Sequence, residues 1–403
     1  MEPDASQPLR VVIAGGGVAG LEAVLVLGQD AGPLTDVVLV GEEPEFRLRA
    51  LSVKEPFAEA GSPSWPIEPL CAEQGAAFRR GRVTDVDVAA RTVALADGAS
   101  LPFDALVVAT GAAAVRPFDG GTLFRGPRDV EAVHGLLQDV EEGYTRTVAF
   151  VVPPGTTWPL PLYELALMLA ERASSLGLDG VGLTMVTPEA QPLEVFGTEA
   201  ADKLAARLRD AGVEIRPRAQ AARIRDGAVL AADDAVLAEA QRVVLLPRLE
   251  GRPPRGLPQD DAGFVPVDEH GRVRGADRVW AAGDGTSCAV KQGGIAAQQA
   301  LAAASDIARL AGADVAPHAF EPVLRAELLT GGRSLWLHHA LGGSGPGEAA
   351  TTEHPLYWPP VKVAAPRLAA WIDAGGHAPP HAADHPRMLL SQGDPLGGIE
   401  LLG

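Results

Sequence analysis

A small number of side chains in this sequence could carry acid–base chemistry. Glu164 lies in a segment whose leucines, including Leu160 and Leu165, predict a largely buried helix. A buried carboxyl group is either paired or has a shifted pKa, so Glu164 could donate or accept a proton in a reaction. A satisfied structural acid, or a residue at a solvated helix end, is the alternative. Glu164 is therefore a candidate catalytic residue.

Thiol chemistry is limited to two cysteines, Cys71 and Cys288, which lie far apart and form no C-x-x-C pair. A disulfide framework is therefore not what stabilises this chain. We expect Cys71 to be a buried, inert thiol. Cys288 is a candidate redox residue, with simple packing as the alternative. One thiol can form an adduct or a sulfenic acid, but it needs a second cysteine to close a disulfide.

Lysine is rare in this chain, which strongly prefers arginine. The only lysines are Lys54, Lys203, Lys291 and Lys362, among 34 basic residues in all. Because burial can tune a lysine and let it transfer a proton, Lys291 is a third candidate. A surface lysine before a helix is the alternative. Near the end of the chain, His377, His381 and His385 have a helical spacing, but intervening prolines oppose a helix, and we predict no metal site.

Three glycines predict a binding site for a dinucleotide. Gly15, Gly17 and Gly20 form G-x-G-x-x-G between an apolar strand and a helix. The first glycine permits a tight turn, the second lets a diphosphate approach the backbone, and the third lets helix and strand pack closely. The amides of Val18 and Ala19, at the helix start, should then face the phosphates with the helix dipole behind them.

The elements around this turn have the length of one βαβ unit. We expect a strand over Leu9 to Ala14, a helix over Val18 to Gln29 and a strand over Asp36 to Val40. Glu42 follows the second strand, about 20 residues beyond Gly20, where an acid accepts hydrogen bonds from a ribose. Glu43 takes this role if the register slips by one. The triplet alone does not distinguish FAD from NAD.

A second series of alternating strands and helices follows. We expect strands over Thr147 to Val152 and Val181 to Thr187, and helices over Leu160 to Ser174 and Thr198 to Ala211. A later strand over Arg278 to Ala282 precedes a helix over Gly294 to Leu310. The fold class is therefore α/β, with two Rossmann-like modules in series and a C-terminal cap region.

Two later segments resemble signatures of the flavoproteins with two dinucleotide-binding domains, in the FAD-dependent pyridine nucleotide-disulfide oxidoreductase superfamily. The segments are Ala109-Thr110-Gly111 and Val279-Trp280-Ala281-Ala282-Gly283-Asp284, each after an apolar strand. The resemblance implies FAD as cofactor, with Asp284 binding its ribityl chain. It adds Arg49, Val83 and Lys291 to the cofactor-binding residues, and it implies that Lys291 stabilises the negative charge of the reduced flavin.

Within this superfamily the chain most resembles the branch of sulfide:quinone oxidoreductases and type II NADH dehydrogenases. The matching residues are Glu45-Phe46, Arg49-Ala50-Leu51, Tyr163-Glu164-Leu165-Ala166, Lys291-Gln292-Gly293 and Gln298-Gln299. The resemblance implies that Glu164 lies close to the flavin, where it would serve a quinone-like substrate. Gln298 and Gln299 could bond flavin or substrate carbonyls, although helix-surface polarity explains them equally well.

The chain departs from this branch at two places. The second module has Pro153-Pro154-Gly155-Thr156-Thr157-Trp158-Pro159 where NADH-using members repeat the glycine turn. Prolines offer no N–H to a diphosphate and Trp158 would obstruct it, so ordinary NAD(P)H binding is not expected. The redox cysteine expected just before Tyr163-Glu164 is also missing. Sulfide:quinone chemistry in its usual form is therefore not expected.

We expect five regions along the chain. The first and second parts of the FAD-binding domain span 8–115 and 247–315, and a degenerate nucleotide-binding-like domain spans 116–246. A cap spans 316–373, and a flexible tail spans 374–403. The aromatic segment from Pro355 to Trp371 is expected to be a protein-packed cover rather than a membrane contact.

Composition excludes some classes of binding partner. A net charge of −18 repels nucleic acid and anionic lipid, and the first ten residues are unlike a secretory signal. We therefore expect a cytoplasmic enzyme, which the sequence allows to be a homodimer, with a small-molecule redox substrate. The leading hypothesis is an FAD-dependent oxidoreductase that moves electrons between a small-molecule or protein donor other than NAD(P)H and a quinone-like or other acceptor. The alternatives are an NADH- or sulfide-dependent quinone reductase and a flavoprotein that has lost catalysis and serves as a binding partner.

Overall fold

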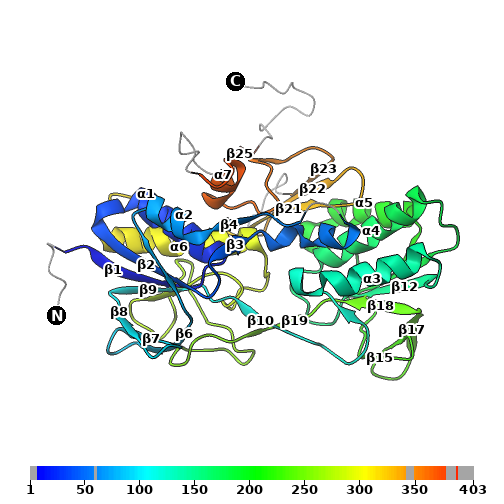
Figure 1. Cartoon of the computed structure of the whole chain (residues 1–403), viewed down its shortest axis with the longest axis horizontal. Coiled ribbons are helices and arrows are strands. Elements are labelled where there is room, and N and C mark those ends of the chain that lie inside the picture. Colours follow the sequence, from blue (N-terminus) through cyan, green and yellow to red (C-terminus); the bar gives the residue numbers. More distant parts are fainter. Residues whose placement is uncertain (1–6, 59–60, 342–348, 378–386, 389–403) are drawn as a thin grey trace.

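The computed structural model describes residues 7–58, 61–341, 349–377 and 387–388. Of the three tail histidines, His377 lies within these ranges, and His381 and His385 lie outside them. Most of the region expected to be a tail also lies outside them. Two modules lie side by side, and the C-terminal part of the chain covers both of them (Figure 1). The α/β class with Rossmann-like modules is confirmed.

The first module is a three-layer sandwich. Its parallel sheet has the order β20-β9-β1-β2-β5. The strands are β1 (Leu9–Ala14), β2 (Thr35–Gly41), β5 (Ala77–Arg80), β9 (Ala105–Val108) and β20 (Val279–Ala281). One face is covered by α1 (Val18–Asp30), α2 (Ile67–Glu73) and α6 (Gly293–Leu310), and the other by an antiparallel sheet of β6 (Val83–Asp87), β7 (Thr92–Leu95) and β8 (Ser100–Pro102).

Alternation along β1 explains how this sheet fills both layers. Val11 and Ile13 are fully buried against α1 and α6, whereas Val12 and Ala14 pack with residues of β6 and β7. A strand covered on both faces has apolar residues at every position rather than at every second one. The helix α1 ends at Asp30, one residue later than predicted and close to Gly32, the expected stop.

The second module repeats this design. Its parallel sheet has the order β11-β18-β12-β13-β14. The strands are β11 (Thr122–Leu123), β12 (Thr147–Val151), β13 (Gly182–Val186), β14 (Val213–Arg216) and β18 (Arg242–Leu245). The helices are α3 (Val130–Glu141), α4 (Leu160–Ser175) and α5 (Thr198–Asp210), and the small antiparallel sheet has β15 (Arg223–Arg225), β16 (Ala228–Leu230) and β17 (Val236–Glu239).

Two connections join the modules. The antiparallel pair of β10 (Ala112–Val115) and β19 (Arg248–Gly251) carries the chain between them (Figure 1). The 3-10 helix η2 (Arg49–Phe57) leaves the first module through the hairpin of β3 (Glu45–Arg47) and β4 (Ser64–Pro66), and it packs against α3 and α4. The remaining short 3-10 turns are η1 (Gly32–Leu34), η3 (Pro127–Asp129) and η4 (Glu194–Phe196). The domain boundaries given above stay a prediction.

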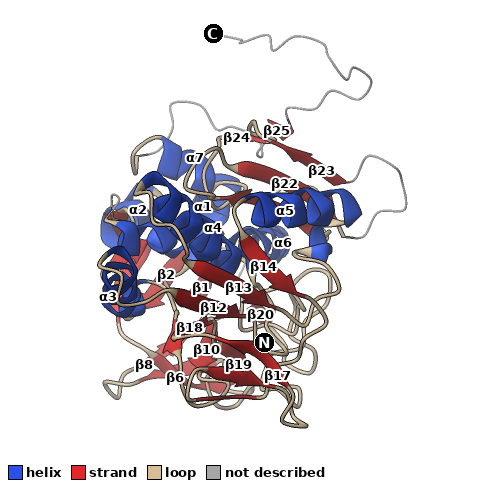
Figure 2. Ribbon diagram, turned by 90° about the vertical axis from the view of Figure 1, so that its right-hand side faces the viewer, coloured by secondary structure: helices blue, strands red, loops and turns tan. Residues whose placement is uncertain are grey.

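The cap lies on the same side of both modules as their helices, opposite β6, β8 and β17 (Figure 2). It contains the antiparallel sheet of β21 (Val323–Leu328), β22 (Leu335–Ala340) and β23 (Ala349–Thr352), the pair of β24 (Tyr357–Trp358) and β25 (Arg387–Met388), and the helix α7 (Leu368–Asp373). Tyr357 and Trp371 are buried, whereas Trp358 is 56% exposed. Most of the aromatic surface of the cap is therefore packed against protein.

Candidate functional site

Three motif segments meet at one edge of the first sheet. The backbone N–H of Gly15 donates to Val40 O (2.8 Å), that of Ala109 to Ala14 O (2.8 Å) and that of Ala282 to Val108 O (3.1 Å). The glycine turn, the A-T-G segment and the G-D segment therefore all follow the carboxyl ends of adjacent parallel strands. Ligands of open α/β sheets bind at this edge, where the strand order reverses.

The glycine turn is as tight as the sequence predicts. Gly15 has a φ of +118°, and a Cβ there would lie 2.2 Å from Ala109 O. A Cβ on Gly20 would lie 1.8 Å from Gly15 O, so this glycine lets α1 pack onto the turn. Gly17 differs from both, because a Cβ there would meet nothing within 4 Å. The second glycine thus leaves open space beside the backbone, which is the space a diphosphate needs.

The first turn of α1 presents free backbone donors to this space. Gly17 is the N-cap residue, it is exposed, and none of the described side chains caps the helix there. The first turn carries no acidic residue. The N–H groups of Val18 and Ala19 are therefore available to an anion at the positive end of the helix dipole.

The acids after β2 are accessible. Glu42 and Glu43 directly follow Gly41, the last residue of β2, and both are exposed. Arg82 approaches Glu42 with 3.7 Å between Nε and Oε1, and more than half of each side chain is exposed. The glutamate therefore keeps a carboxylate that a ribose could reach. Val83, at the start of β6, is 6% exposed in the core, so only its backbone can contact a cofactor.

The A-T-G and G-D segments lie against each other. Gly111 has a φ of +71°, and a Cβ on Gly285 would lie 2.9 Å from Gly111 O. Gln299 fixes the G-D turn, because its Oε1 accepts the N–H of Gly283 (2.8 Å). The amide of Gln298 bonds both backbone groups of Val323. The protein thus uses both glutamines to hold its own backbone, and a flavin contact is not needed to explain them.

Asp284 and Lys291 influence each other electrostatically at this edge. Burial raises the pKa of the Asp284 carboxyl group, while the charges of Lys291 and Arg49 oppose this rise. Burial lowers the pKa of the Lys291 ammonium group against the attraction of Asp284. In both groups desolvation outweighs the mutual attraction, which is typical of functional sites.

Lys291 is held in place by two further contacts. Its Nζ donates to Thr286 O and lies 3.8 Å from the centroid of the Phe264 ring, and the residue is 5% exposed. Lys291 is therefore not a surface lysine. Arg49 opens η2 and is exposed on the same side as Asp284, as its electrostatic contact shows. The residues Gly15 to Gly20, Glu42, Asp284 and Lys291 together fit a flavin dinucleotide.

The two cysteines differ in their surroundings. Cys71 is fully buried in the core of the first module, where burial raises the pKa of its thiol to about 12. Such a thiol stays protonated and unreactive at neutral pH, as expected. Cys288 is partly exposed, lies close enough to Lys291 to interact with its charge, and packs beside the core of the second module. A redox role for Cys288 stays a prediction.

Glu164 is fully buried and paired. Its Oε1 accepts the N–H of Leu329 (2.9 Å) and bonds the ammonium group of Lys362, while its Oε2 is buried without a hydrogen-bond partner. Burial raises the pKa of this carboxyl group, and Lys362 opposes the rise. Glu164 is thus paired, as expected of a structural acid. It also keeps one oxygen without a partner, as expected of a catalytic acid or base. A catalytic role for Glu164 stays a prediction.

In the second module, prolines and a tryptophan fill the turn that corresponds to the glycine turn of the first. The segment between β12 and α4 contains three prolines, Pro153, Pro154 and Pro159, which carry no N–H, and Pro161 is the second residue of α4. Trp158 packs edge-to-face against Phe196, with ring centroids 5.8 Å apart. Gly155, with a φ of +80°, is the only glycine of this turn. Backbone donors of the kind found at the start of α1 are largely missing from this turn.

The corresponding acid of the second module, Glu189, already accepts hydrogen bonds from protein groups. Glu189 lies just beyond β13, as Glu42 lies beyond β2. One oxygen of Glu189 accepts hydrogen bonds from Tyr163 Oη (2.6 Å) and Thr187 Oγ1 (2.8 Å), and the other accepts the N–H of Leu193 (3.1 Å). Burial raises the pKa of this carboxyl group. A ribose would have to displace these protein donors to bind Glu189.

Comparison with known proteins identifies the family. The family model described as pyridine nucleotide-disulphide oxidoreductase matches residues 9–304. The chain belongs to this family. The NADH dehydrogenase-like protein MT1860 of Mycobacterium tuberculosis is 31% identical over 295 residues, which cover 68% of this chain and 72% of that protein. Demethylphylloquinone reductase NdbB of Synechocystis is 31% identical over 184 residues, covering 42% and 44% of the two chains.

Solved structures of the same fold extend the comparison. The sulfide:quinone oxidoreductase of Aquifex aeolicus superposes with a TM-score of 0.77 at 18% identity, covering 85% of this chain and 86% of that one. A ferredoxin reductase of Rhodopseudomonas palustris gives a TM-score of 0.61 at 20% identity, covering 84% of each chain. The family is one of oxidoreductases, so this chain is an oxidoreductase.

Two features are absent from the described residues. No helix there is long and apolar enough to cross a membrane. No group of three or more His, Cys, Asp or Glu side chains, within the same part of the chain, could hold a metal ion.

Sequence reasoning missed the partners of the buried acids. Lys362, Glu189 and Glu22 each make hydrogen bonds that join distant segments. Glu22 stands alone as an acid within the apolar run of α1, and this isolation was the available signal. A fully buried carboxylate needs donors, but the sequence does not show which distant backbone supplies them.

Proposed function

We propose that this oxidoreductase binds FAD in its first module and transfers electrons from a donor other than NAD(P)H to a quinone-like acceptor. One observation carries the proposal. The turn after β1 offers open space and free N–H groups to a diphosphate, whereas the turn after β12 offers prolines and Trp158. One module is therefore equipped for a dinucleotide and the other is not.

The residues that would hold the cofactor have distinct tasks. The N–H groups of Val18 and Ala19 would bind the diphosphate, and Glu42 would accept the ribose hydroxyls. Asp284 would bind the ribityl chain. When bound, FAD supplies the two-electron chemistry, and the protein supplies positioning and charge. The ammonium group of Lys291, already surrounded by Thr286 O and the Phe264 ring, would place a positive charge beside the reduced cofactor.

A quinone-like acceptor is supported by similarity and by the protein's own proton carriers. Demethylphylloquinone reductase NdbB and sulfide:quinone oxidoreductase both have a quinone in their names. Reduction of a quinone consumes protons as well as electrons. Glu164 and Lys362 form a buried pair that can hold one proton, and the free Oε2 of Glu164 can accept another bond.

An anaerobic titration tests the proposal. The purified protein is mixed with NADH, NADPH, sulfide or dithionite, and the visible absorbance of the flavin is followed. We expect dithionite to bleach the flavin and both nicotinamide cofactors to leave it oxidised, and we expect a soluble quinone to restore the colour. Rapid bleaching by NADH would refute the donor assignment, and a colourless protein that takes up no FAD would refute the whole proposal.

NADH remains the second candidate donor, because two relatives from Mycobacterium tuberculosis are named NADH dehydrogenase-like proteins. Gly155 keeps one flexible position in the turn after β12. The same titration distinguishes the two donors.

A further inference from the structure

The cap contains a cluster of polar side chains that the proposed function does not use. The sheet β21-β22-β23 has two faces. Leu324 and Leu328, with Leu335 and Leu337, pack into the core of the second module. The opposite face carries Arg325 and His338, which are direct cross-strand neighbours. Residues directly opposite each other in antiparallel strands point to the same face and lie within reach of each other.

Aromatic side chains cover this face of the sheet. Tyr357 is fully buried, and its ring packs edge-to-face on Trp336 with centroids 5.2 Å apart. Trp336, Leu356, Tyr357 and Ala364 form a separate small hydrophobic cluster. Burial and the charge of Glu327 raise the pKa of Tyr357, and Arg325 lies close enough to oppose this rise. Two strands and the following segment thus bring Arg325, His338 and Tyr357 together in an apolar setting.

Arg325 lacks a counter-charge within the described part of the chain. Its Nε is buried without a hydrogen-bond partner, and no ion pair joins its guanidinium group to a described carboxylate. Burial lowers its pKa. Glu327, the next residue on this face of β21, instead accepts a hydrogen bond from Ser334 Oγ (2.8 Å). Arg325 is partly exposed, but a buried Nε without a hydrogen-bond partner is costly, so its retention calls for an explanation.

The two neighbours of Arg325 also have unused hydrogen-bonding capacity. His338 is 6% exposed, and its Nδ1 is buried without a partner. Burial and the charge of Arg325 lower the pKa of His338 to about 4, so the imidazole is neutral at pH 7. The hydroxyl of Tyr357 reaches Val361 O at 3.4 Å, which is long for an O–H···O bond.

We propose that Arg325, His338 and Tyr357 form a binding site for an oxyanion, the carboxylate or phosphate group of a small ligand. Such a group would neutralise the guanidinium charge and accept hydrogen bonds from all three side chains, with His338 donating through Nδ1. The apolar surroundings would strengthen these bonds, because water is kept out. The site lies in the cap and does not depend on the proposed function.

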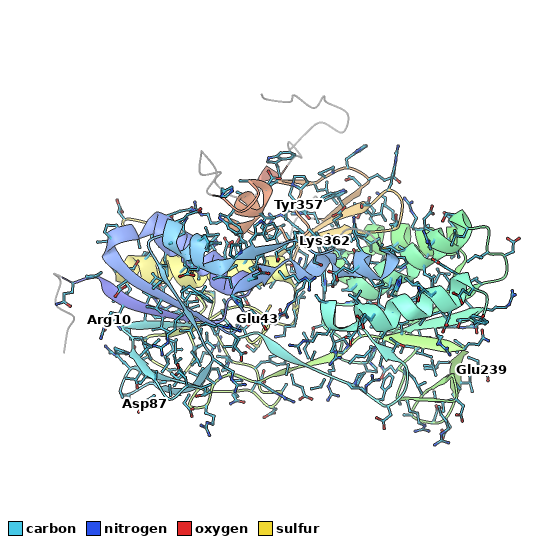
Figure 3. The ribbon with its side chains drawn as sticks, viewed as in Figure 1. Arg10, Glu43, Asp87, Glu239, Tyr357 and Lys362 are labelled. Atoms are coloured by element: carbon cyan, nitrogen blue, oxygen red, sulfur yellow. The ribbon has the colours of Figure 1, made fainter. Side chains whose placement is uncertain are left out.

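Occupancy of this site would act on Glu164 through a short piece of chain. Tyr357 reaches the backbone oxygen of Val361, the residue before Lys362, and both labelled side chains belong to the cap (Figure 3). Lys362 bonds Glu164 of α4, and it also donates to the backbone oxygen of Glu327 in β21, the strand that carries Arg325. An anion that holds Tyr357 against β21 would therefore also hold the Lys362 side of the buried ion pair.

Titration of the full-length protein with inorganic phosphate and with acetate tests the site. Chloride keeps the ionic strength constant, and thermal stability and tryptophan fluorescence are measured. We expect a saturable rise in Tm and a change in the emission of Trp336. In Arg325→Met the Kd should be weaker by about tenfold or more, the loss expected for one charge-assisted bond. Phosphate or acetate binding more tightly would identify the source of the oxyanion.

A second measurement separates a ligand site from a structural arginine. Without phosphate or acetate, Arg325→Met should be at least as stable as the wild type, because it removes a partly buried cation whose Nε has no hydrogen-bond partner. Arg333→Met is the matched control, since Arg333 lies in the same sheet's hairpin, is 78% exposed and pairs with Glu353. It should bind the anions like the wild type. A lower Tm of Arg325→Met in chloride, an equal response of this variant to the anions, or no saturable response in the wild type would each overturn the proposal.

Discussion

Strand β1 of the first module and strand β12 of the second occupy the same place in their sheets. The inner strand orders β9-β1-β2-β5 and β18-β12-β13-β14 correspond to each other, and a long helix follows each central strand. The turns between strand and helix have diverged. Gly15, Gly17 and Gly20 keep the first turn tight and open, whereas prolines and Trp158 fill the second. The topology is thus compatible with either turn, and only the turn's residues decide what it can bind.

The helices that follow these two turns, α1 and α4, remain alike in one respect. Glu22 is the fifth residue of α1 and Glu164 is the fifth residue of α4, and both are fully buried. Each carboxylate binds the cap. Glu22 accepts the N–H groups of Arg367 (2.7 Å) and Leu368 (2.8 Å), and Glu164 accepts that of Leu329 and bonds Lys362. The cap is therefore fastened to both modules through equivalent positions, although only one module keeps an open turn.

The largest effect is expected from the first turn. In Gly20→Ala the new Cβ would lie 1.8 Å from Gly15 O, a clash with backbone that cannot relax locally, so the variant should fail to fold or to retain flavin. Gly17→Ala should fold normally, because a Cβ there meets nothing within 4 Å, but it should bind FAD at least about tenfold more weakly. Circular dichroism and flavin content measure both.

Gly135→Ala in α3 is the control for these glycine variants. A Cβ on Gly135 would also meet nothing, and alanine is favoured over glycine in a helix by about 1 kcal/mol. This variant should keep its flavin and become slightly more stable. Unchanged FAD affinity in Gly17→Ala would contradict the assignment of the diphosphate to the first turn.

The next largest effect concerns the pH dependence of cap anchoring. Burial raises the pKa of Glu22 to about 7, above its ordinary value of 4.5. The native state thus holds this proton more tightly than the unfolded state, so the associated stability is complete below about pH 4.5. It is lost as the pH rises to about 7, by on the order of 3 kcal/mol. Glu22→Gln, which cannot ionise, should remove this loss.

Urea unfolding between pH 5 and pH 8 measures the difference between wild type and Glu22→Gln. The exposed acid Glu131, in the first turn of α3, provides the control as Glu131→Gln. We expect this control to leave the pH dependence of the wild type unchanged. Parallel pH profiles for wild type and Glu22→Gln would show that Glu22 titrates normally in the folded protein.

Much of this comparison was readable from the sequence. The elements Leu9–Ala14 and Val213–Arg216 have the predicted bounds, and α1 and α4 each end one residue later than predicted. Strands buried on both faces and amphipathic helices have strong periodic signals. The tight packing of Gly15 and Gly20 was predicted from their spacing, because close approach of backbone leaves room only for glycine.

Other features were not readable, since they depend on contacts between distant segments. The helices η2 and α3 were not predicted. Arg49–Phe57 contains an internal proline and adopts a 3-10 conformation, so its pattern does not follow the α-helical period. The bonds from Glu189 to Tyr163 and from Glu164 to Lys362 join segments with no relationship in sequence. Burial reveals that such acids need partners, but only the fold supplies them.

An intermediate effect is expected at the acid of the second module. Tyr163→Phe removes the 2.6 Å hydrogen bond to Glu189 and leaves a partly buried carboxylate with one donor fewer. The free energy of unfolding should fall by about 1–3 kcal/mol. Flavin content should not change, because this acid lies outside the proposed cofactor site. Loss of flavin in this variant, with its stability unchanged, would instead indicate that Glu189 serves a ligand.

The smallest effect is expected at the corresponding acid of the first module. The pair between Arg82 and Glu42 spans 3.7 Å with both side chains mostly exposed, so water and salt screen it. Arg82→Ala should change the free energy of unfolding by less than about 1 kcal/mol, and added salt should reduce even this difference. Urea unfolding at low and high salt checks both points. A loss as large as that of Tyr163→Phe would mean that Glu42 is structurally committed like Glu189, and it would remove the contrast between an acid left free for a ribose and one held by the protein.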